Sequence, residues 1–250
     1  MSNMTKRKIA ELINILKSLK SVVVAFSGGV DSTFLLKMAV DTLGKKNVLA
    51  VTAASETYPL REFKEAKILA KKIGARLKVI NTSELRIKDF KNNPVNRCYY
   101  CKKELFSKLN AIARKEGLDF RIDGTNYDDL KDTRYGRFAA RELGIRSPLL
   151  EAGMTKNDIR RFSRKMGLET WKKPSFACLA SRFPHNTGIT RKKLSQVEAA
   201  EEYLKGLGVR QVRVRCHGDL ARIEIYRADM GIIIGRENYA AICRRLRRLG

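Results

Sequence analysis

The feature that most constrains this chain is a pair of glycines between an apolar run and a helix-forming run. Residues 21–33 read Ser-Val-Val-Val-Ala-Phe-Ser-Gly-Gly-Val-Asp-Ser-Thr. Residues without a Cβ let a loop turn sharply and bring its N–H groups close to a ligand. The helix that follows begins with unpaired N–H groups, which favour an anion. The stretch therefore predicts a phosphate-binding loop between a strand and a helix.

The side chains of this loop indicate the kind of phosphate site. Hydroxyl groups can donate to phosphate oxygens, and Asp31 can bind Mg²⁺ beside them. No lysine follows the glycines, so this is not the G-x-x-x-x-G-K-[ST] loop. The alternative is a plain strand–turn–helix joint in which the glycines only ease packing. The residues predicted to contact a nucleotide here are Ser27, Gly28, Gly29, Asp31, Ser32 and Thr33.

The order Ser-Gly-Gly-x-Asp-Ser resembles the signature of the PP-loop ATP pyrophosphatases. The resemblance implies that the chain binds ATP with Mg²⁺. It also implies that ATP is split into AMP and pyrophosphate, with AMP attached to an oxygen of the substrate. Six matched positions, correctly placed between strand and helix, favour this interpretation over the plain joint.

Strand and helix patterns alternate through the first two thirds of the chain. Predicted strands cover residues 22–26, 48–53, 77–81, 120–123 and 147–150, and predicted helices cover 7–20, 30–43, 59–74, 100–116, 135–143 and 155–166. Strands joined by single helices form a parallel sheet with helices on both faces. A ligand of such a sheet lies beyond the carboxyl ends of the strands. We therefore expect the Ser27 loop, residues 52–59 and the segment with Gly124 and Thr125 to meet at one nucleotide.

The pattern changes after about residue 168. Residues 171–190 show no period, which is typical of a functional loop. A helix over 190–206, strands over 211–216 and 221–226, and a helix over 236–248 follow. The predicted fold class is α/β: a parallel-sheet PP-loop (adenine nucleotide alpha hydrolase-like) domain with a small C-terminal α+β domain. The predicted divisions are 1–168, a cysteine-bearing active-site loop over 169–189, and 190–250.

Five cysteines are present, at positions 98, 101, 178, 216 and 243. Cys98 and Cys101 open the predicted helix, and their spacing of three places both sulfurs on one helical face. A helix N-terminus lowers the pKa of a thiol. By itself such a pair is a redox dithiol, half of a zinc site, or two thiols without a function. Cys216 in a strand and Cys243 on the last helix are interpreted as core thiols.

Further segments resemble the LarE family of PP-loop sulfurtransferases. The matching segments are residues 96–102, 123–129, 136–137, 142–145, 147–149, 174–182 and 217–224. The resemblance implies adenylation of a carboxylate of pyridinium-3,5-biscarboxylic acid mononucleotide, followed by replacement of AMP with sulfur. The product leads to the nickel-pincer nucleotide cofactor of lactate racemase. The domain over 190–250 would then bind substrate and form oligomers.

In that family Cys178 matches the sulfur-bearing cysteine. Members that also have the Cys-x-x-Cys pair hold a [4Fe–4S] cluster on three thiolates, here Cys98, Cys101 and Cys178. The fourth iron stays open and carries an extra sulfide. Where the cysteine stands alone, it loses its own sulfur and becomes dehydroalanine. A zinc site completed by His185 is the remaining alternative.

Four polar residues are predicted to act on the substrate. Ser181 and Arg182 follow Cys178 closely and would orient the substrate beside the sulfur, and together with Cys178 they form the predicted catalytic set. Arg213 and Arg215 alternate in a strand and project from one face, where two guanidinium groups can clamp a phosphate. Surface charge is the other interpretation of this pair. The family resemblance favours binding of the mononucleotide phosphate.

Composition bounds the partners. The chain has 52 Lys and Arg against 26 Asp and Glu, a net charge of +26, which suits a polyanion. The excess is spread along the chain, so a nucleic acid partner is not favoured, although it stays open. No apolar run reaches the ~18 residues of a membrane helix, and no signal peptide is evident. We expect a cytoplasmic enzyme with sulfide or another sulfur donor, and the resemblance implies a homotrimer or hexamer.

Three rival functions remain at this point. A tRNA thiolase of the PP-loop and [4Fe–4S] type also combines a phosphate loop with three cluster cysteines. An amidating PP-loop ligase would use ammonia and keep its cysteines for structure. An RNA-binding protein without activity would leave the phosphate loop unexplained.

Overall fold

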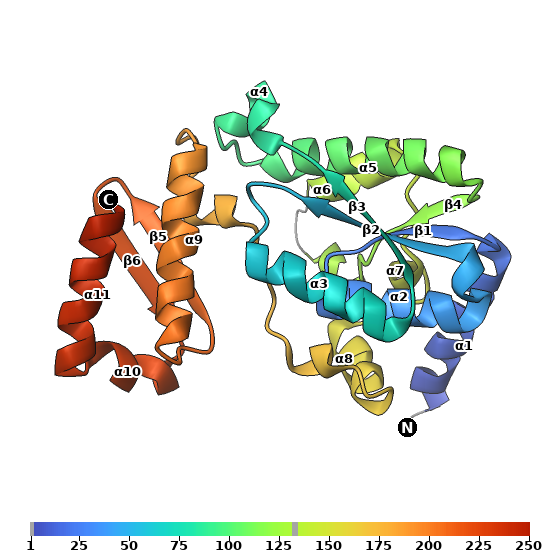
Figure 1. Cartoon of the computed structure of the whole chain (residues 1–250). Coiled ribbons are helices and arrows are strands. Elements are labelled where there is room, and N and C mark those ends of the chain that lie inside the picture. The colour runs from blue at the N-terminus through green and yellow to red at the C-terminus, as the bar shows by residue number, and fades with distance from the viewer. Residues whose placement is uncertain (1–2, 132–134) are drawn as a thin grey trace. The chain divides into compact units, whose positions relative to one another are not determined.

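The computed structural model describes residues 3–131 and 135–250. The chain forms two compact units (Figure 1). The first contains Met1–Thr82 and Asn96–Phe176, and the second contains Ser83–Val95 and Ala177–Gly250. These divisions differ from the boundaries at 168 and 189 that the sequence suggested, which stay predictions.

A four-stranded parallel sheet forms the centre of the first unit, in the order β3-β2-β1-β4. The strands are β1 (Val22–Ala25), β2 (Val48–Ala54), β3 (Arg76–Asn81) and β4 (Phe120–Ile122). Strand β1 pairs with β2 from Val22 opposite Val48, and with β4 from Val22 opposite Phe120. Every residue of β1 is buried, because helices cover both faces of a parallel sheet. The predicted α/β class is confirmed.

Alternate residues of β1 enter two different cores. Val22 and Val24 pack with one set of helices, whereas Val23 and Ala25 pack with another, because successive side chains of a strand point to opposite faces. The first core is covered by α1 (Asn3–Leu19), α2 (Val30–Leu43), α3 (Leu60–Ile73), α7 (Pro148–Glu151) and α8 (Lys156–Lys165). The second core is covered by α5 (Arg97–Glu116) and α6 (Gly136–Glu142). Figure 1 shows α5 and α6 on one side of the sheet and α2 and α3 on the other.

The predicted fifth strand, over residues 147–150, is wrong. Residues 148–151 form the helical turn α7, with Pro148 at its first position. Proline has no N–H to donate to a sheet, but its fixed φ suits the first turn of a helix. Among the described residues, a single parallel bridge between Ile122 and Arg146 continues the sheet on this side. The sheet pairing therefore ends before the predicted strand begins.

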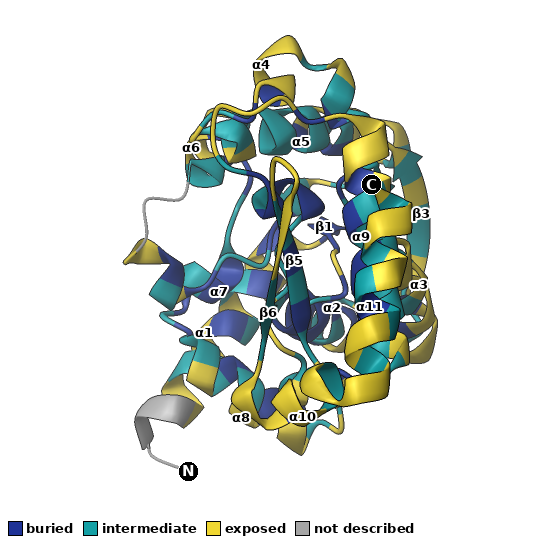
Figure 2. Ribbon diagram, turned by 90° about the vertical axis from the view of Figure 1, so that its left-hand side faces the viewer, coloured by how far each residue is buried: buried dark blue, intermediate teal, exposed yellow. Residues whose placement is uncertain are grey.

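The second unit is a hairpin packed on helices. Strands β5 (Val212–His217) and β6 (Leu220–Ile225) are antiparallel. Their apolar side chains pack with α9 (Arg191–Gly206) and α11 (Arg236–Leu249), and α10 (Met230–Ile234) precedes α11. Figure 2 shows exposed residues along the outer side of α11. The core includes Leu204, Val212, Val214 and Ile242.

A short segment from the middle of the chain also belongs to the second unit. It carries the helical turn α4 (Lys88–Lys91). The Asn93 amide donates to the Phe183 carbonyl at 3.2 Å and to the Pro184 carbonyl at 2.7 Å. The Ile189 N–H donates to the Lys91 carbonyl at 3.0 Å. These bonds hold the segment against the chain that follows Cys178.

Within the described residues, no helix has the length and apolar character that a membrane span requires.

Candidate functional site

The loop between β1 and α2 has a backbone that only glycine accommodates. Gly28 has a φ of +63°, and a Cβ there would lie 2.9 Å from the Ala66 Cβ and 3.0 Å from the Ala66 Cα. Ala66 lies on α3, which therefore packs directly against the loop. Gly29 is extended and immediately precedes α2. The loop thus turns sharply in front of a helix N-terminus, where an anion is favoured.

The hydroxyl groups of the loop lie close to one another. Ser27 Oγ and Ser32 Oγ are 3.1 Å apart, and Ser32 Oγ donates to the Gly29 carbonyl at 3.3 Å. Thr33 is fully buried, and its Oγ1 has no hydrogen-bond partner among the described residues. A phosphate at this helix end would meet hydroxyl and amide donors together.

Asp31 is the acidic group of the loop, and its two carboxylate oxygens differ. Its Oδ2 pairs with the Lys156 ammonium at the start of α8. Its Oδ1 is buried and has no hydrogen-bond partner in the described part of the chain. Burial raises the pKa of Asp31 above its ordinary value, and Lys156 opposes this rise. Because Mg²⁺ prefers oxygen ligands, the unpartnered Oδ1 fits a divalent cation.

The segment after β4 approaches the same loop. A Cβ on Gly124 would lie 3.0 Å from the Ser32 nitrogen, so the two segments are in contact there. Thr125 Oγ1 donates to Asp123 Oδ2 at 2.8 Å, and Ser147 Oγ donates to Asp123 Oδ1 at 2.7 Å. Two segments predicted to meet, the Ser27 loop and the segment with Gly124, are therefore adjacent, and Asp123 fixes the second.

Two residues that hold the loop were not singled out from the sequence. The Tyr58 hydroxyl donates to the Ser27 carbonyl at 2.6 Å. The Lys173 ammonium donates to the Gly28 carbonyl at 3.2 Å and pairs with Glu62 at 2.7 Å. Tyr58 lies in the segment 52–59 that was expected at this edge. Lys173 gave no signal, because it is 145 positions from Gly28.

The predicted sulfur-site cysteines lie in different units. Cys98 is exposed and Cys101 is half-buried, and they are the second and fifth residues of α5 in the first unit. Cys178 is half-buried in the second unit, directly before a helical turn over Leu179–Arg182. Within the described ranges, no three His, Cys, Asp or Glu side chains form a group that could hold a metal ion. The cluster and the zinc site with His185 both stay predictions.

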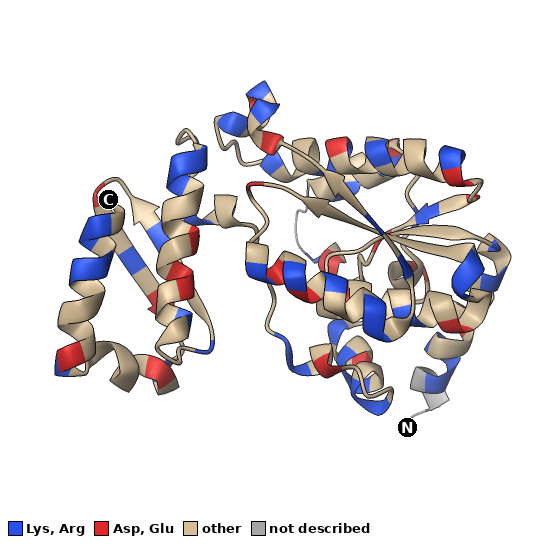
Figure 3. Cartoon of the chain, in the orientation of Figure 1, with Lys and Arg blue, Asp and Glu red and all other residues tan. Residues whose placement is uncertain are grey.

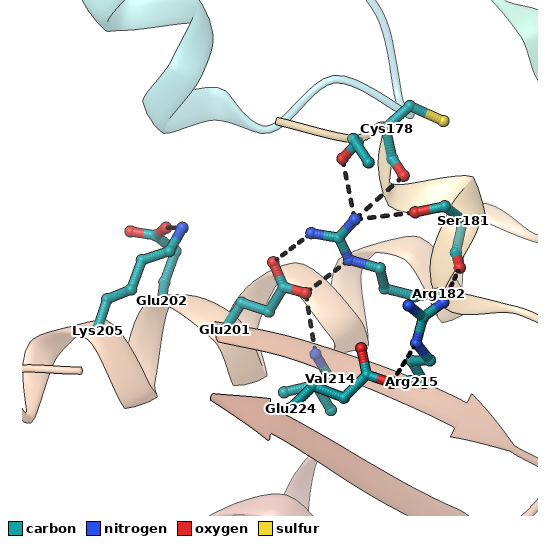
Figure 4. A network of polar contacts seen from close by, with 10 residues as sticks. Cys178, Ser181, Arg182, Glu201, Glu202, Lys205, Val214, Arg215 and Glu224 are labelled. Atoms are coloured by element: carbon teal, nitrogen blue, oxygen red, sulfur yellow. Dashed lines mark hydrogen bonds and ion pairs between the residues drawn. The ribbon is translucent and has the colours of Figure 1, made fainter. Parts of the chain in front are cut away.

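Arg182 lies at the centre of a buried polar network (Figure 4). It binds both oxygens of Glu201 on α9, at 2.7 and 3.0 Å. Its other nitrogen donates to the Ala177 carbonyl at 2.9 Å and to Ser181 Oγ at 2.9 Å. Arg182 is 3% exposed. These contacts fix the turn that carries Cys178.

The two strand arginines have different surroundings. Arg215 pairs with Glu224 at 2.7 Å and donates to the Ser181 carbonyl at 2.9 Å. Arg213 lies opposite Glu224 in the hairpin register. Val212 and Val214, which alternate with them along the strand, are buried. Both arginines therefore lie on the outer face of β5, and Arg215 also connects the hairpin to the Cys178 turn.

Basic residues occur on elements of both units (Figure 3), in keeping with the spread of the net charge of +26 along the sequence. The phosphate loop differs from this general surface, because its cations are Lys156 and Lys173 from distant parts of the chain. Charge alone does not identify a partner.

Fold and loop together define a PP-loop α/β protein, and comparison with known families agrees. The NAD synthase family profile matches residues 3–117. That match includes the phosphate loop and the Cys98–Cys101 pair, and it ends before Cys178.

Longer similarity is found to individual proteins. The pyridinium-3,5-bisthiocarboxylic acid mononucleotide synthase of Lactiplantibacillus plantarum is 44% identical over 224 residues, which cover 90% of this chain and 81% of that protein. An uncharacterized protein of Synechocystis sp. is 43% identical, over 89% of this chain and 82% of its own length. One of Methanocaldococcus jannaschii is 34% identical, over 88% and 84%. The chain belongs to the family of the first of these, the LarE family.

Proposed function

We propose that this chain is an ATP-dependent sulfurtransferase. It would adenylate a carboxylate of pyridinium-3,5-biscarboxylic acid mononucleotide and then replace AMP with sulfur. The observation that carries the proposal is 44% identity, over 90% of the chain, to a synthase of the bisthiocarboxylic acid mononucleotide. The glycine loop before α2 supports the nucleotide half of the reaction.

The first half-reaction needs positioning and charge neutralisation. The α2 N-terminus and the hydroxyls of Ser27, Ser32 and Thr33 would bind the phosphates of ATP, and Gly124 and Thr125 would border the nucleotide. Asp31 would hold Mg²⁺ through its unpartnered Oδ1. A carboxylate oxygen of the substrate attacks the α-phosphorus, and pyrophosphate leaves with the electron pair of the broken P–O bond. The product is a mixed anhydride with AMP.

The second half-reaction replaces an oxygen by sulfur. We assign Cys98, Cys101 and Cys178 as thiolate ligands of a [4Fe–4S] cluster, because three thiolates leave one iron open. When bound, the cluster would supply exchangeable sulfide. A C–S bond forms at the activated carbonyl, the C–O bond to AMP breaks, and AMP carries away the electron pair.

The remaining residues would position the Cys178 turn and the substrate. Arg182 and Ser181 would hold the turn that presents Cys178, through the contacts to Ala177 and Glu201. Arg213 and Arg215 would bind the phosphate of the pyridinium mononucleotide. The sulfur would come from sulfide or another donor. A role in making the nickel-pincer cofactor of lactate racemase, and a trimeric or hexameric assembly, belong to the same proposal.

The activity test uses the purified chain with ATP, Mg²⁺, sulfide and pyridinium-3,5-biscarboxylic acid mononucleotide. We expect AMP, pyrophosphate and a thiocarboxylate product detected by mass spectrometry. Ammonia consumption with an amide product would instead identify an amidating ligase. The match of residues 3–117 to the NAD synthase family is the reason to test for this activity. Turnover only with tRNA would identify a tRNA thiolase.

The cluster has a separate test. Anaerobic reconstitution should give about four irons per chain. Replacing Cys98, Cys101 or Cys178 with Ala should abolish the iron, while Cys216→Ala and Cys243→Ala should retain it. Stoichiometric zinc, or loss of one sulfur from Cys178 after a single turnover, would overturn the cluster assignment.

A further inference from the structure

The phosphate loop receives its cation from a distant helix. Lys156 is the first residue of α8, and its ammonium pairs with Asp31 Oδ2 although 125 positions separate them. The two side chains are 31% and 20% exposed. The loop itself contains no lysine. Lys156 is therefore the ammonium in direct contact with the acidic group of this loop.

The backbone at Lys156 is held firmly. Thr155 and Asp158 form a capping box that fixes the start of α8. The Lys156 N–H donates to Asp128 Oδ2 at 2.8 Å. These contacts fix where the side chain begins but leave its four-carbon stem able to turn. The ammonium can thus change partner without any movement of the helix.

The charges around Asp31 explain why it needs a partner. Burial raises the pKa of Asp31, and the nearby carboxylate of Asp129 raises it further, whereas Lys156 lowers it. A buried carboxylate without a cation is costly. In the structure Lys156 supplies that cation. The other oxygen, Oδ1, is buried and has no hydrogen-bond partner among the described residues.

Binding of a divalent cation changes this balance. Mg²⁺ on Asp31 would neutralise the carboxylate and repel the neighbouring ammonium. Phosphate oxygens that arrive with the metal offer the ammonium a new charged partner. Lysine suits such an exchange, because it is a compact charge on a flexible stem.

We propose that Lys156 is a phosphate-positioning residue that exchanges Asp31 for the phosphates of the nucleotide when Mg²⁺ binds. The inference rests on the proposed ATP site and deepens it. Lys156 would then contact the phosphates as the lysine of a G-x-x-x-x-G-K-[ST] loop does, a residue that this loop lacks. Before Mg²⁺ and the nucleotide bind, Asp31 and Lys156 form one ion pair. After they bind, Asp31 contacts Mg²⁺ and Lys156 contacts a phosphate.

The first test measures metal and nucleotide binding separately. In Lys156→Met, Mn²⁺ without nucleotide should bind more tightly, by about tenfold, because no ammonium competes for Asp31. Binding of Mg²⁺–ATP, measured by calorimetry, should weaken by about tenfold. The matched control is Lys37→Met. It removes a half-buried lysine of α2 that pairs with Asp41 on that helix and is about as exposed as Lys156. It should change neither affinity.

The second test isolates the exchange. In Asp31→Asn, ATP in the presence of EDTA should bind more tightly than to the natural chain, because Lys156 is released. The double variant Asp31→Asn with Lys156→Met should lose that gain. A gain that survives in the double variant would overturn the inference, since it would come only from removal of a negative charge.

The outcomes separate this inference from the proposed function. If the natural chain binds no Mg²⁺–ATP, the proposed function fails. If it binds Mg²⁺–ATP and Lys156→Met binds it equally well, only the inference fails. A lower melting temperature with both affinities unchanged would show a purely structural lysine. The inference would fail in that case too.

Discussion

Arg182 Nε donates to Glu201 Oε1 at 2.7 Å, and both side chains are 4% exposed. The same Glu201 oxygen accepts the Val214 N–H at 3.0 Å. One buried carboxylate therefore ties the Cys178 turn, helix α9 and strand β5 together. Arg182 acts in this structure as the residue that positions the turn (Figure 4).

Removing this carboxylate should destabilise the second unit. Glu201→Ala leaves the Arg182 guanidinium buried without its counter-ion, which costs about 3–5 kcal/mol. Urea denaturation measures the change. The control is Glu202→Ala, the next residue, which removes a partly exposed pair with Lys205 and should cost less than about 1 kcal/mol. Equal losses in the two variants would contradict the assignment.

Gly28→Ala should impair nucleotide binding. A side chain there adopts a positive φ, at a cost of about 1–2 kcal/mol, and its Cβ would also lie 2.9 Å from the Ala66 Cβ. Gly153→Ala is the matched control, because Gly153 has the same φ of +63° and a Cβ there would meet no atom within 4 Å. We expect calorimetry to show lost ATP binding for Gly28→Ala alone, with lower stability in both. Intact ATP binding in Gly28→Ala would contradict the assignment of this loop as the nucleotide-binding site.

The strand arginines should give different results. Arg215→Ala removes the contacts to Glu224 and Ser181, so it should lower both the melting temperature and the affinity for the pyridinium mononucleotide. Arg213→Ala should weaken substrate binding by about tenfold or more, with little change in melting temperature. Thermal denaturation and titration with the mononucleotide test this. Unchanged affinity for the mononucleotide in both variants would show that Arg213 and Arg215 are surface charges without a role in binding.

Acid should weaken the contact between α1 and α8. Burial acts to raise the pKa of Asp158, but hydrogen bonds from Lys8 and Thr155 outweigh it and hold the pKa below its ordinary value. A carboxyl whose folded pKa is depressed stabilises the fold above its unfolded pKa of about 3.9. That contribution is lost as the pH falls through the folded value.

Asp158→Asn should therefore be less stable than the natural chain near neutral pH. The difference should shrink as the pH falls below about 4. Urea unfolding across this range measures it. Lys8→Met should lose part of the same pH dependence, because it removes one of the bonds that depress the pKa. A difference that does not vary with pH would assign the effect to the helix cap alone.

The sequence predicted most of the first unit correctly, because the signals are local. The apolar run of β1, the glycines and the helix pattern of α2 are contiguous, and parallel topology follows from single helices between strands. The α2 helix was predicted with the bounds Val30–Leu43 that the structure has. The strand expected over residues 147–150 failed. Pro148, which cannot donate to a sheet, begins a helical turn there instead.

By itself, the sequence determined the parallel sheet and the glycine loop before α2, because each depends on neighbouring residues or a short motif. The roles of the cysteines and of the two strand arginines stay predictions. Only the tertiary structure decided which side chains serve the loop. Lys156 and Lys173 reach it from positions more than a hundred residues away, and Arg182 finds Glu201 inside a core. Such pairings follow from the packing of whole elements, which no local pattern specifies.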